Sequence, residues 1–199
     1  MAQRNAWVLL TTGLARLEGE NAMYIRASDN VREIGYRVQG FLTVRKDSLR
    51  VPLNGSLTLH VDAESRMFSG DLVLDQSAIS RAFLGARIFS ATVQIEAGSV
   101  IGGTDHEGRM YATVKVDASI AAVRAAGLTL ISGGSCRTAT HAVVPLHSEP
   151  GFNLERGGRL TGAYQRPPFT GCGWITPLVN LLVAGPGNTV VIDLIPRGS

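Results

Sequence analysis

The sequence has few cysteines, few charged residues and no long apolar segment, and each shortage excludes a class of protein. Only two of the 199 residues are cysteines, and neither belongs to a Cys-x-x-Cys pair, which argues against a structural zinc site. No apolar run approaches the ~20 residues of a membrane-spanning helix, so we expect no transmembrane span. Charged residues make up 18%, below the roughly 25% of typical soluble domains, while 45% are hydrophobic. That balance excludes a disordered chain.

The net charge of +3 is modest, and the basic residues are spread along the chain. The densest basic set lies within residues 32–50, where Glu33 and Asp47 interrupt it. Tyr36 and Phe41 fall among these residues, in a pattern that single-strand nucleic-acid binders also show. A solvated strand face has the same pattern and is the simpler interpretation. We therefore expect no nucleic-acid partner.

Most of the chain alternates apolar and polar residues with the period of two that is typical of β-strands. A wide hairpin turn is predicted over residues 102–108. Short strands at regular spacing, with little helix, predict a single all-β domain over residues 1–195, either an antiparallel β-sandwich or a barrel. Residues 196–199 are interpreted as a tag remnant. The predicted strands are 6–15, 22–26, 34–44, 51–53, 57–61, 68–74, 88–96, 110–116, 128–131, 142–146, 159–164 and 189–194.

Three segments carry more specific local signals. Asn54-Gly55, between two short alternating runs, predicts a tight hairpin with Pro52 on an edge strand. Residues 75–84 are predicted to form a short helix, with an aspartate at its start and a glycine after its end. Residues 118–126 are rich in alanine, which favours a helix, but their β-branched residues suit a continued strand. Both interpretations of this last segment stay open.

The two cysteines, Cys136 and Cys172, lie in loops of small residues where two backbone segments can approach closely. A disulfide between them would stabilise the fold by roughly 3–4 kcal/mol in the chain-entropy model. It would also indicate an oxidising compartment, and hence an extracellular or cell-envelope protein. Two buried reduced thiols are the alternative. The run Ala6–Ala15 is too weak for the apolar core of a signal peptide, so we expect the chain to lack its export signal.

The segment of about residues 176–184 has the clearest helix signals in the chain. Thr176 is a preferred N-cap residue, Pro177 suits the first helical position, and Gly185 followed by proline predicts the end of the helix. The residues between these signals are apolar on nearly every side. We expect such a helix to be buried in the protein, in a partner or against a ligand.

The sequence shows no arrangement of residues that predicts catalysis, a metal ion or a cofactor. Asp105-His106-Glu107 is expected to be a solvated turn, because adjacent residues on a hairpin tip do not converge on one ion. His60 and Asp62 share one strand face and are interpreted as a surface pair. The Gly-Gly-Ser-Cys run at 133–136 lacks the strand–turn–helix context of a nucleophile elbow. We therefore predict a protein that is not an enzyme and has no cofactor and no metal.

Several short motifs occur in order over roughly residues 53–194. They are Phe68–Leu72, Gly134–Thr138, Leu160–Tyr164, Pro168–Gly173, and the stretch from Thr176 to Asn188. This series resembles a family of secreted or cell-envelope, β-rich proteins of actinobacteria. The resemblance implies an exported, disulfide-linked domain of unknown biochemical role, and it supplies no catalytic residues.

The apolar helix and the aromatic residues beside Cys172 suggest an apolar ligand. In the simpler interpretation, the helix only plugs a barrel or covers a sheet. We predict instead that it helps to enclose a cavity of at least ~300 Å³ for an apolar or amphipathic molecule such as a lipid. The alternatives are a structural or adhesion module that acts through its surface, and a hydrolase whose site the sequence does not reveal. The oligomeric state stays open. The predicted ligand-binding residues are Phe169, Trp174, Leu178, Leu181 and Leu182.

Overall fold

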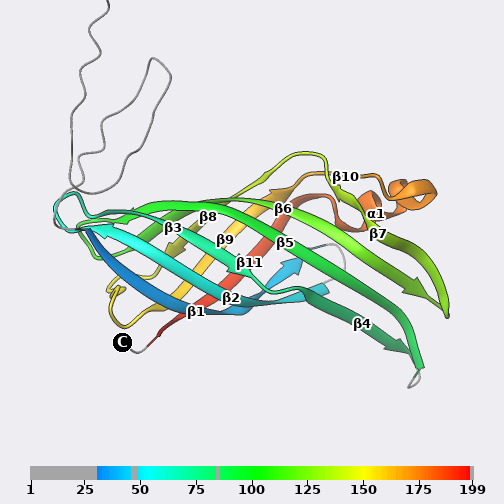
Figure 1. Ribbon diagram of the computed structural model, residues 1–199, viewed down its shortest axis with the longest axis horizontal. Coiled ribbons are helices and arrows are strands. Elements are labelled where there is room, and N and C mark those ends of the chain that lie inside the picture. The colour runs from blue at the N-terminus through cyan, green and yellow to red at the C-terminus, as the bar shows by residue number, and fades with distance from the viewer. Residues whose placement is uncertain (1–30, 46–48, 84–85, 198–199) are drawn as a thin grey trace, which may run out of the picture.

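The computed structural model describes residues 31–45, 49–83 and 86–197, so the strands predicted at 6–15 and 22–26 lie outside the described residues. In the described part of the chain, eight antiparallel strands close into a barrel (Figure 1). The all-β prediction is confirmed, and the architecture is a barrel. Around the barrel the strands are β1 (Val31–Val44), β2 (Leu49–Asp62), β3 (Met67–Leu74), β5 (Ala86–Thr104), β6 (Met110–Ala125), β8 (Ala142–Ser148), β9 (Gly158–Arg166) and β11 (Gly185–Pro196), which pairs with β1.

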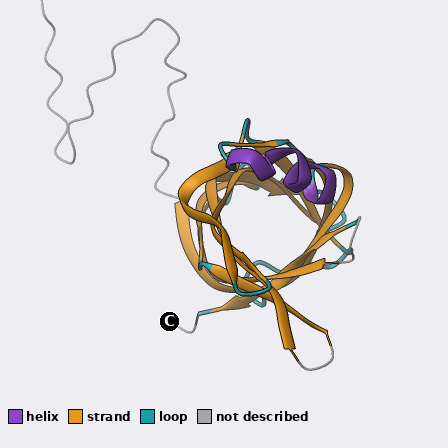
Figure 2. Ribbon diagram, turned by 90° about the vertical axis from the view of Figure 1, so that its right-hand side faces the viewer, coloured by secondary structure: helices purple, strands orange, loops and turns teal. Residues whose placement is uncertain are grey.

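Further elements extend the barrel at one end, which we call the mouth. β5 and β6 pair with each other along their length and run beyond their barrel neighbours β3 and β8. There β4 (Ser77–Phe83) pairs with β5, β7 (Leu128–Thr138) pairs with β6, and β10 (Phe169–Thr170) pairs with β7. The 3-10 turn η1 (Gly173–Ile175) and the helix α1 (Thr176–Val183) follow β10. Figure 2 looks into this end and shows the helix against one side of the ring of strands.

The opposite end, which we call the base, carries the turns at 63–66, 105–109 and 149–157. The largest fully buried side chains, Tyr36, Leu59, Met110 and Leu160, lie in this half of the barrel. The Tyr36 hydroxyl donates a hydrogen bond to the carbonyl oxygen of Leu154 in a base turn. Burial raises the pKa of Tyr36 to about 12, because the charged phenolate would lose its hydration there. The base is therefore a packed core with its polar group satisfied.

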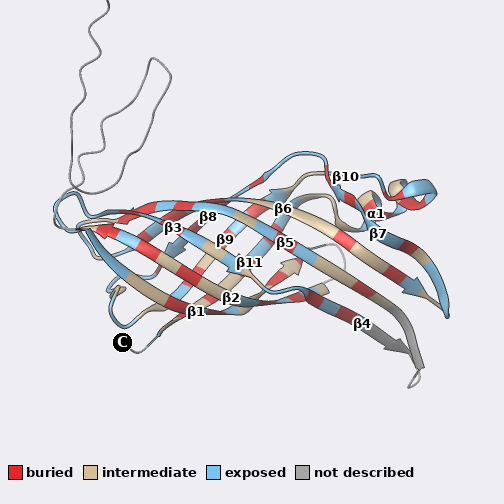
Figure 3. Cartoon of the chain, in the orientation of Figure 1, coloured by how far each residue is buried: buried red, intermediate tan, exposed pale blue. Residues whose placement is uncertain are grey.

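Burial alternates along the barrel strands, as the period-two pattern predicts (Figure 3). In β8, for example, Ala142, Val144 and Leu146 are buried, and the residues between them are exposed. Successive side chains of a strand point to opposite faces, so one set fills the interior and the other meets water. This alternation places the apolar core inside the barrel.

The hairpin predicted at Asn54-Gly55 is wrong, because β2 runs straight through both residues. Gly55 instead permits close approach of β3: a side-chain carbon there would meet the carbonyl oxygen of Val73 at 2.1 Å. The pairing of β2 with β3 ends at Gly55, and Pro52 lies beyond it. Proline has no amide hydrogen to donate, but at this position no hydrogen bond to β3 is lost. Asn54-Gly55 has the composition of a tight turn, but in the sheet the glycine serves to let β2 and β3 approach closely.

The helix predicted at 75–84 is also wrong, because this stretch contains the strand β4. Ser77 and Ile79 are buried while Ala78 and Ser80 are exposed, which is the alternation of a strand. Pairing with β5 satisfies its backbone, and this tertiary contact overrides the local preference. The segment 118–126, left open between helix and strand, continues β6 as far as Ala125.

The helix α1 agrees with the predicted range within one residue, but it begins differently from the prediction. The chain enters it from η1, and the Thr176 hydroxyl donates a hydrogen bond to the Gly173 carbonyl oxygen at 2.8 Å instead of capping a helix amide. Pro177 lies in the first turn as expected. Among the described residues, no helix is long and apolar enough to cross a membrane.

At the carboxyl end, Pro196 belongs to β11, and the Arg197 amide donates to the Gly35 carbonyl oxygen at 2.9 Å. These two residues, which the sequence assigned to a tag remnant, therefore pack against β1.

Candidate functional site

The principal candidate site is an apolar cavity of about 250 Å³ at the mouth. Its walls come from α1 and η1 on one side and from the mouth ends of β1, β2, β4, β5, β6, β7, β9 and β10 on the others. Of the described residues that line it, all except Arg166 are apolar. Such a space is favourable for an apolar group, because its lining offers water almost no hydrogen-bond partners.

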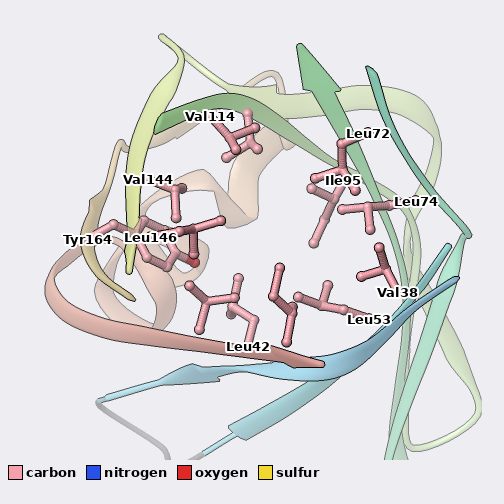
Figure 4. Close-up of a pocket in the computed structure, with 13 residues that line it drawn as sticks. Val38, Leu42, Leu53, Leu72, Leu74, Ile95, Val114, Val144, Leu146 and Tyr164 are labelled. Carbon is pink, nitrogen blue, oxygen red and sulfur yellow. The ribbon is translucent and has the colours of Figure 1, made fainter. Parts of the chain in front are cut away.

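A second, smaller cavity of about 50 Å³ lies deeper in the barrel (Figure 4). Its lining is aliphatic apart from Tyr164. Ile95 lines both cavities, so they are adjacent, and the apolar interior extends from the mouth toward the barrel centre. The deeper space is too small for more than the tip of a ligand.

The volume of the mouth cavity limits what it can hold. It is below the ~300 Å³ predicted from the sequence, which is the lower end of typical small-molecule sites. It exceeds the ~150 Å³ apolar cavity that is known to bind a benzene ring. A cavity of about 250 Å³ therefore suits a single apolar chain or ring, and excludes a lipid with two long chains held entirely inside.

Among the described lining residues Arg166 is the one that is charged, and its side chain is half-buried. Its guanidinium donates a hydrogen bond to the Tyr164 hydroxyl at 2.8 Å, and it makes no ion pair with a described residue. Burial raises the pKa of Tyr164, so this hydroxyl stays neutral. A partly desolvated cation without a carboxylate favours an anionic group beside it. The site thus combines an apolar space with one positive charge.

Three contacts hold the η1–α1 segment against the strands. The predicted disulfide is confirmed: it joins Cys136 of β7 to Cys172, whose Cα atoms are 4.3 Å apart. The Asn180 side chain accepts from the Phe169 amide at 2.6 Å and donates to the Phe169 carbonyl oxygen at 3.0 Å. The Ser135 hydroxyl donates to the carbonyl oxygen of Gly171 at 3.0 Å. Asn180 thereby acts as an extra pairing partner for β10.

The structure brings together part of the predicted ligand-binding set. Phe169, Leu178 and Leu182 line the mouth cavity. Trp174 and Leu181 do not line it, and their exposed fractions are 81% and 66%. Within the described chain, α1 is therefore buried on one side only, and burial of its other side in a partner or against a ligand stays a prediction.

Sequence reasoning missed other members of the site. Ile175, Val179 and Val183 line the cavity from the same segment of chain, and Arg166 lines it from β9. The spacing of Ile175, Val179 and Leu182 by three or four residues marks one helix face, so this signal was available. Nothing in the sequence around Arg166 distinguishes it from the other arginines.

A polar groove on the outer barrel wall is the candidate for the hydrolase alternative, with a volume of about 380 Å³. There His141 Nδ1 lies 2.7 Å from Asp117 Oδ2, and both side chains are exposed. In the described part of the chain, no serine or cysteine side chain is hydrogen bonded to His141. No group of three histidine, cysteine or acidic residues that could hold a metal occurs among the described residues. The groove thus holds a hydrogen-bonded histidine and aspartate, with no serine or cysteine among the described residues to complete a nucleophilic site.

Comparisons with protein-family models, with curated proteins and with solved structures found no match. Any functional conclusion rests on the geometry of the mouth.

Proposed function

We propose that this is a non-catalytic, secreted or cell-envelope binding protein that holds a single-chain anionic amphiphile in the mouth cavity. The observation that carries the proposal is an apolar cavity of about 250 Å³ with a charged residue, Arg166, in the described part of its lining. The apolar chain of the ligand occupies the cavity, and its anionic head contacts the guanidinium. The disulfide supports an oxidising compartment.

The energetics are consistent with moderate affinity. Each methylene group that leaves water contributes roughly 0.8 kcal/mol. A hydrogen bond from arginine to an anionic head adds about 1.5–3 kcal/mol. Association itself costs about 4 kcal/mol or more, so we expect dissociation constants near the micromolar range for a chain of moderate length.

The proposal is tested with two fluorescent probes that differ in charge. One is 1-anilinonaphthalene-8-sulfonate, which is anionic, and the other is the uncharged N-phenyl-1-naphthylamine. Ala91 lines the cavity and is buried, so A91F fills the cavity and should abolish binding of both probes. A163F adds the same ring on the outer face of β9 and should leave binding unchanged.

Substitution of Arg166 separates the apolar contribution from the charge. R166Q should lower the affinity for the anionic probe about tenfold or more, which is equivalent to at least ~1.4 kcal/mol. The affinity for the neutral probe should not change. R156Q removes an exposed arginine at the base and serves as the control. Equal loss of both probes in R166Q, or retained binding in A91F, would contradict the proposal.

The alternative is a structural or adhesion module that acts through its surface. The exposed apolar residues of α1 favour it, since such residues often mark an interface. Native mass spectrometry of protein purified from its own host distinguishes the two. A retained amphiphile supports the binding protein, and a ligand-free oligomer supports the module.

A further inference from the structure

Charges are distributed unevenly between the two ends of the barrel. At the base, arginines and carboxylates alternate along the turns and the strand ends, and three arginines form ion pairs with acidic side chains. The N–O distances are 2.6, 2.6 and 2.8 Å, for Arg32–Glu155, Arg109–Glu107 and Arg159–Asp193 respectively. Positive charge at the base is thus largely compensated within the protein.

At the mouth, positive charge is not compensated in this way. The sequence has no aspartate or glutamate in residues 76–95, 118–148 or 156–192, and these segments form most of the mouth. The described arginines at this end make no ion pair with a described residue. They are Arg45 and Arg50 at the ends of β1 and β2, Arg124 near the end of β6, and Arg166 at the cavity.

The mouth also carries the most exposed apolar side chains of the described residues. Trp174 is 81% exposed, Leu128 at the β6–β7 turn is 68% exposed, and Leu181 is 66% exposed. Leu178 and Leu182 of α1 are 50% and 40% exposed. Figure 3 shows this end of the molecule, with pale blue on the helix and on the tip of β7. Exposed leucines and tryptophan therefore lie at the same end as uncompensated arginines.

We propose that the mouth docks onto an anionic lipid bilayer. Trp174 and the outer side of α1 enter the boundary between head groups and acyl chains, where the amphipathic indole ring is most stable. The arginines contact the lipid phosphates, and each strengthens binding roughly fivefold. This combination of apolar side chains and flanking cations is typical of helices that lie in a membrane interface.

A bilayer fits these observations better than a protein partner. The exposed large apolar side chains of η1 and α1 are Trp174, Leu178, Leu181 and Leu182, far fewer than the roughly 20–30 residues that each partner contributes to a standard protein interface. A specific protein partner would also need acidic side chains placed against each arginine, whereas a fluid anionic surface matches any spacing of cations. The cavity lies at the same end, so a docked protein would present its apolar interior to the lipids.

The proposal rests on the surface of the mouth and not on what the cavity binds. It is tested by flotation with vesicles of phosphatidylcholine alone and with vesicles that also contain phosphatidylglycerol. We expect binding to the anionic vesicles only, and release at high salt because the charges are then screened.

Two variants with matched controls locate the docking surface. R45Q/R124Q should weaken binding to the anionic vesicles roughly thirtyfold, from about 1 kcal/mol for each arginine. R66Q/R156Q removes the same charge at the base and should have little effect. W174S should weaken binding roughly tenfold, while V73S, at a 62% exposed position on the barrel wall, should not. Equal losses at both ends would mean that only net charge matters, and would overturn the proposal.

Fluorescence distinguishes a bilayer from a second copy of the chain. The sequence has two tryptophans, so W7F leaves Trp174 as the sole one. Its emission should shift to shorter wavelength only when anionic vesicles are added. A shift with protein concentration alone, with a doubled mass by light scattering, would overturn the proposal in favour of self-association. We expect W174S to retain probe binding and A91F to retain vesicle binding. These two results would show that membrane docking and cavity binding are independent properties.

Discussion

The base and the mouth are continuous parts of one sheet, yet they differ in packing and in charge. At the base, Tyr36, Leu59 and Met110 are fully buried, and the deeper barrel leaves a space of only about 50 Å³. At the mouth the cavity is about 250 Å³, and neighbouring apolar side chains are exposed. Three arginines at the base are ion-paired, whereas the described arginines at the mouth are not.

The difference follows from how each end is closed. An eight-stranded barrel is just wide enough for its own side chains to fill, so the base needs no other element. At the mouth, β5 and β6 run past β3 and β8, and the wall is completed by β4, β7, β10 and a short helix. These extra elements bury apolar side chains of their own, among them Ile131, Phe169 and Val179, but a cavity of about 250 Å³ remains between them and the barrel strands. A binding cavity thus arises where regular closure of the barrel ends.

The largest effect that separates the two ends should come from truncating one leucine at each. Leu59 is fully buried, so L59A should lower the free energy of unfolding by about 3–5 kcal/mol. Leu182 lines the cavity and is 40% exposed, so L182A should cost about 1 kcal/mol or less. Urea unfolding of both variants measures the comparison. Similar losses would mean that the mouth is packed as tightly as the base.

Loss of the disulfide should have the next largest effect. The double variant C136A/C172A should lower the free energy of unfolding by about 2–4 kcal/mol. Because the disulfide anchors η1 and α1 to β7, amide hydrogen exchange should increase more in α1 than in β1. Equal increases in both elements would show that the disulfide acts only on the unfolded chain.

The smallest effect should come from acidification of an ion pair at the base. Arg159 donates hydrogen bonds to both carboxylate oxygens of Asp193, at 2.8 and 3.0 Å, and these hold the pKa of that carboxyl below its usual value. The folded pKa is below the unfolded one, so the pair stabilises fully above about pH 4 and less as the pH falls through the folded pKa.

Both side chains of the pair are partly in water, so this contribution is small. The stability difference between the wild type and D193N, measured by urea unfolding, should shrink between pH 6 and pH 3. A difference that stays constant over that range would contradict the assignment of the shift to this pair.

Much of the fold could be predicted because its signals are local. The alternation of β8 and β9 and the helix between Thr176 and Ala184 both follow from nearby residues. The failures came where a local signal competed with a distant partner. Asn54-Gly55 resembles a turn but pairs within β2, and the segment containing β4 resembles a helix but pairs with β5.

The candidate site was predictable only in part, for a related reason. Sequence hydrophobicity identified α1 as the apolar wall but did not reveal which side of it faces the strands. Phe169, Leu178 and Leu182 therefore line the cavity, whereas Trp174 and Leu181 lie outside it. Arg166 lines the site because β9 ends at the mouth. The residues next to Arg166 in the sequence do not reveal where the strand ends relative to a cavity.

The sequence by itself determined the all-β class and the short helix, because residue periodicity and helix-ending residues act over a few positions. It suggested the disulfide, but the tertiary structure brought Cys136 and Cys172 together across 36 residues. The absence of acidic residues from the segments of the mouth is also a property of the sequence. Only the tertiary structure decided that β11 closes the barrel against β1, that a cavity remains under α1, and that arginines and exposed apolar residues share one end. These features depend on pairing between strands far apart in the chain, and local preferences carry no information about such pairing.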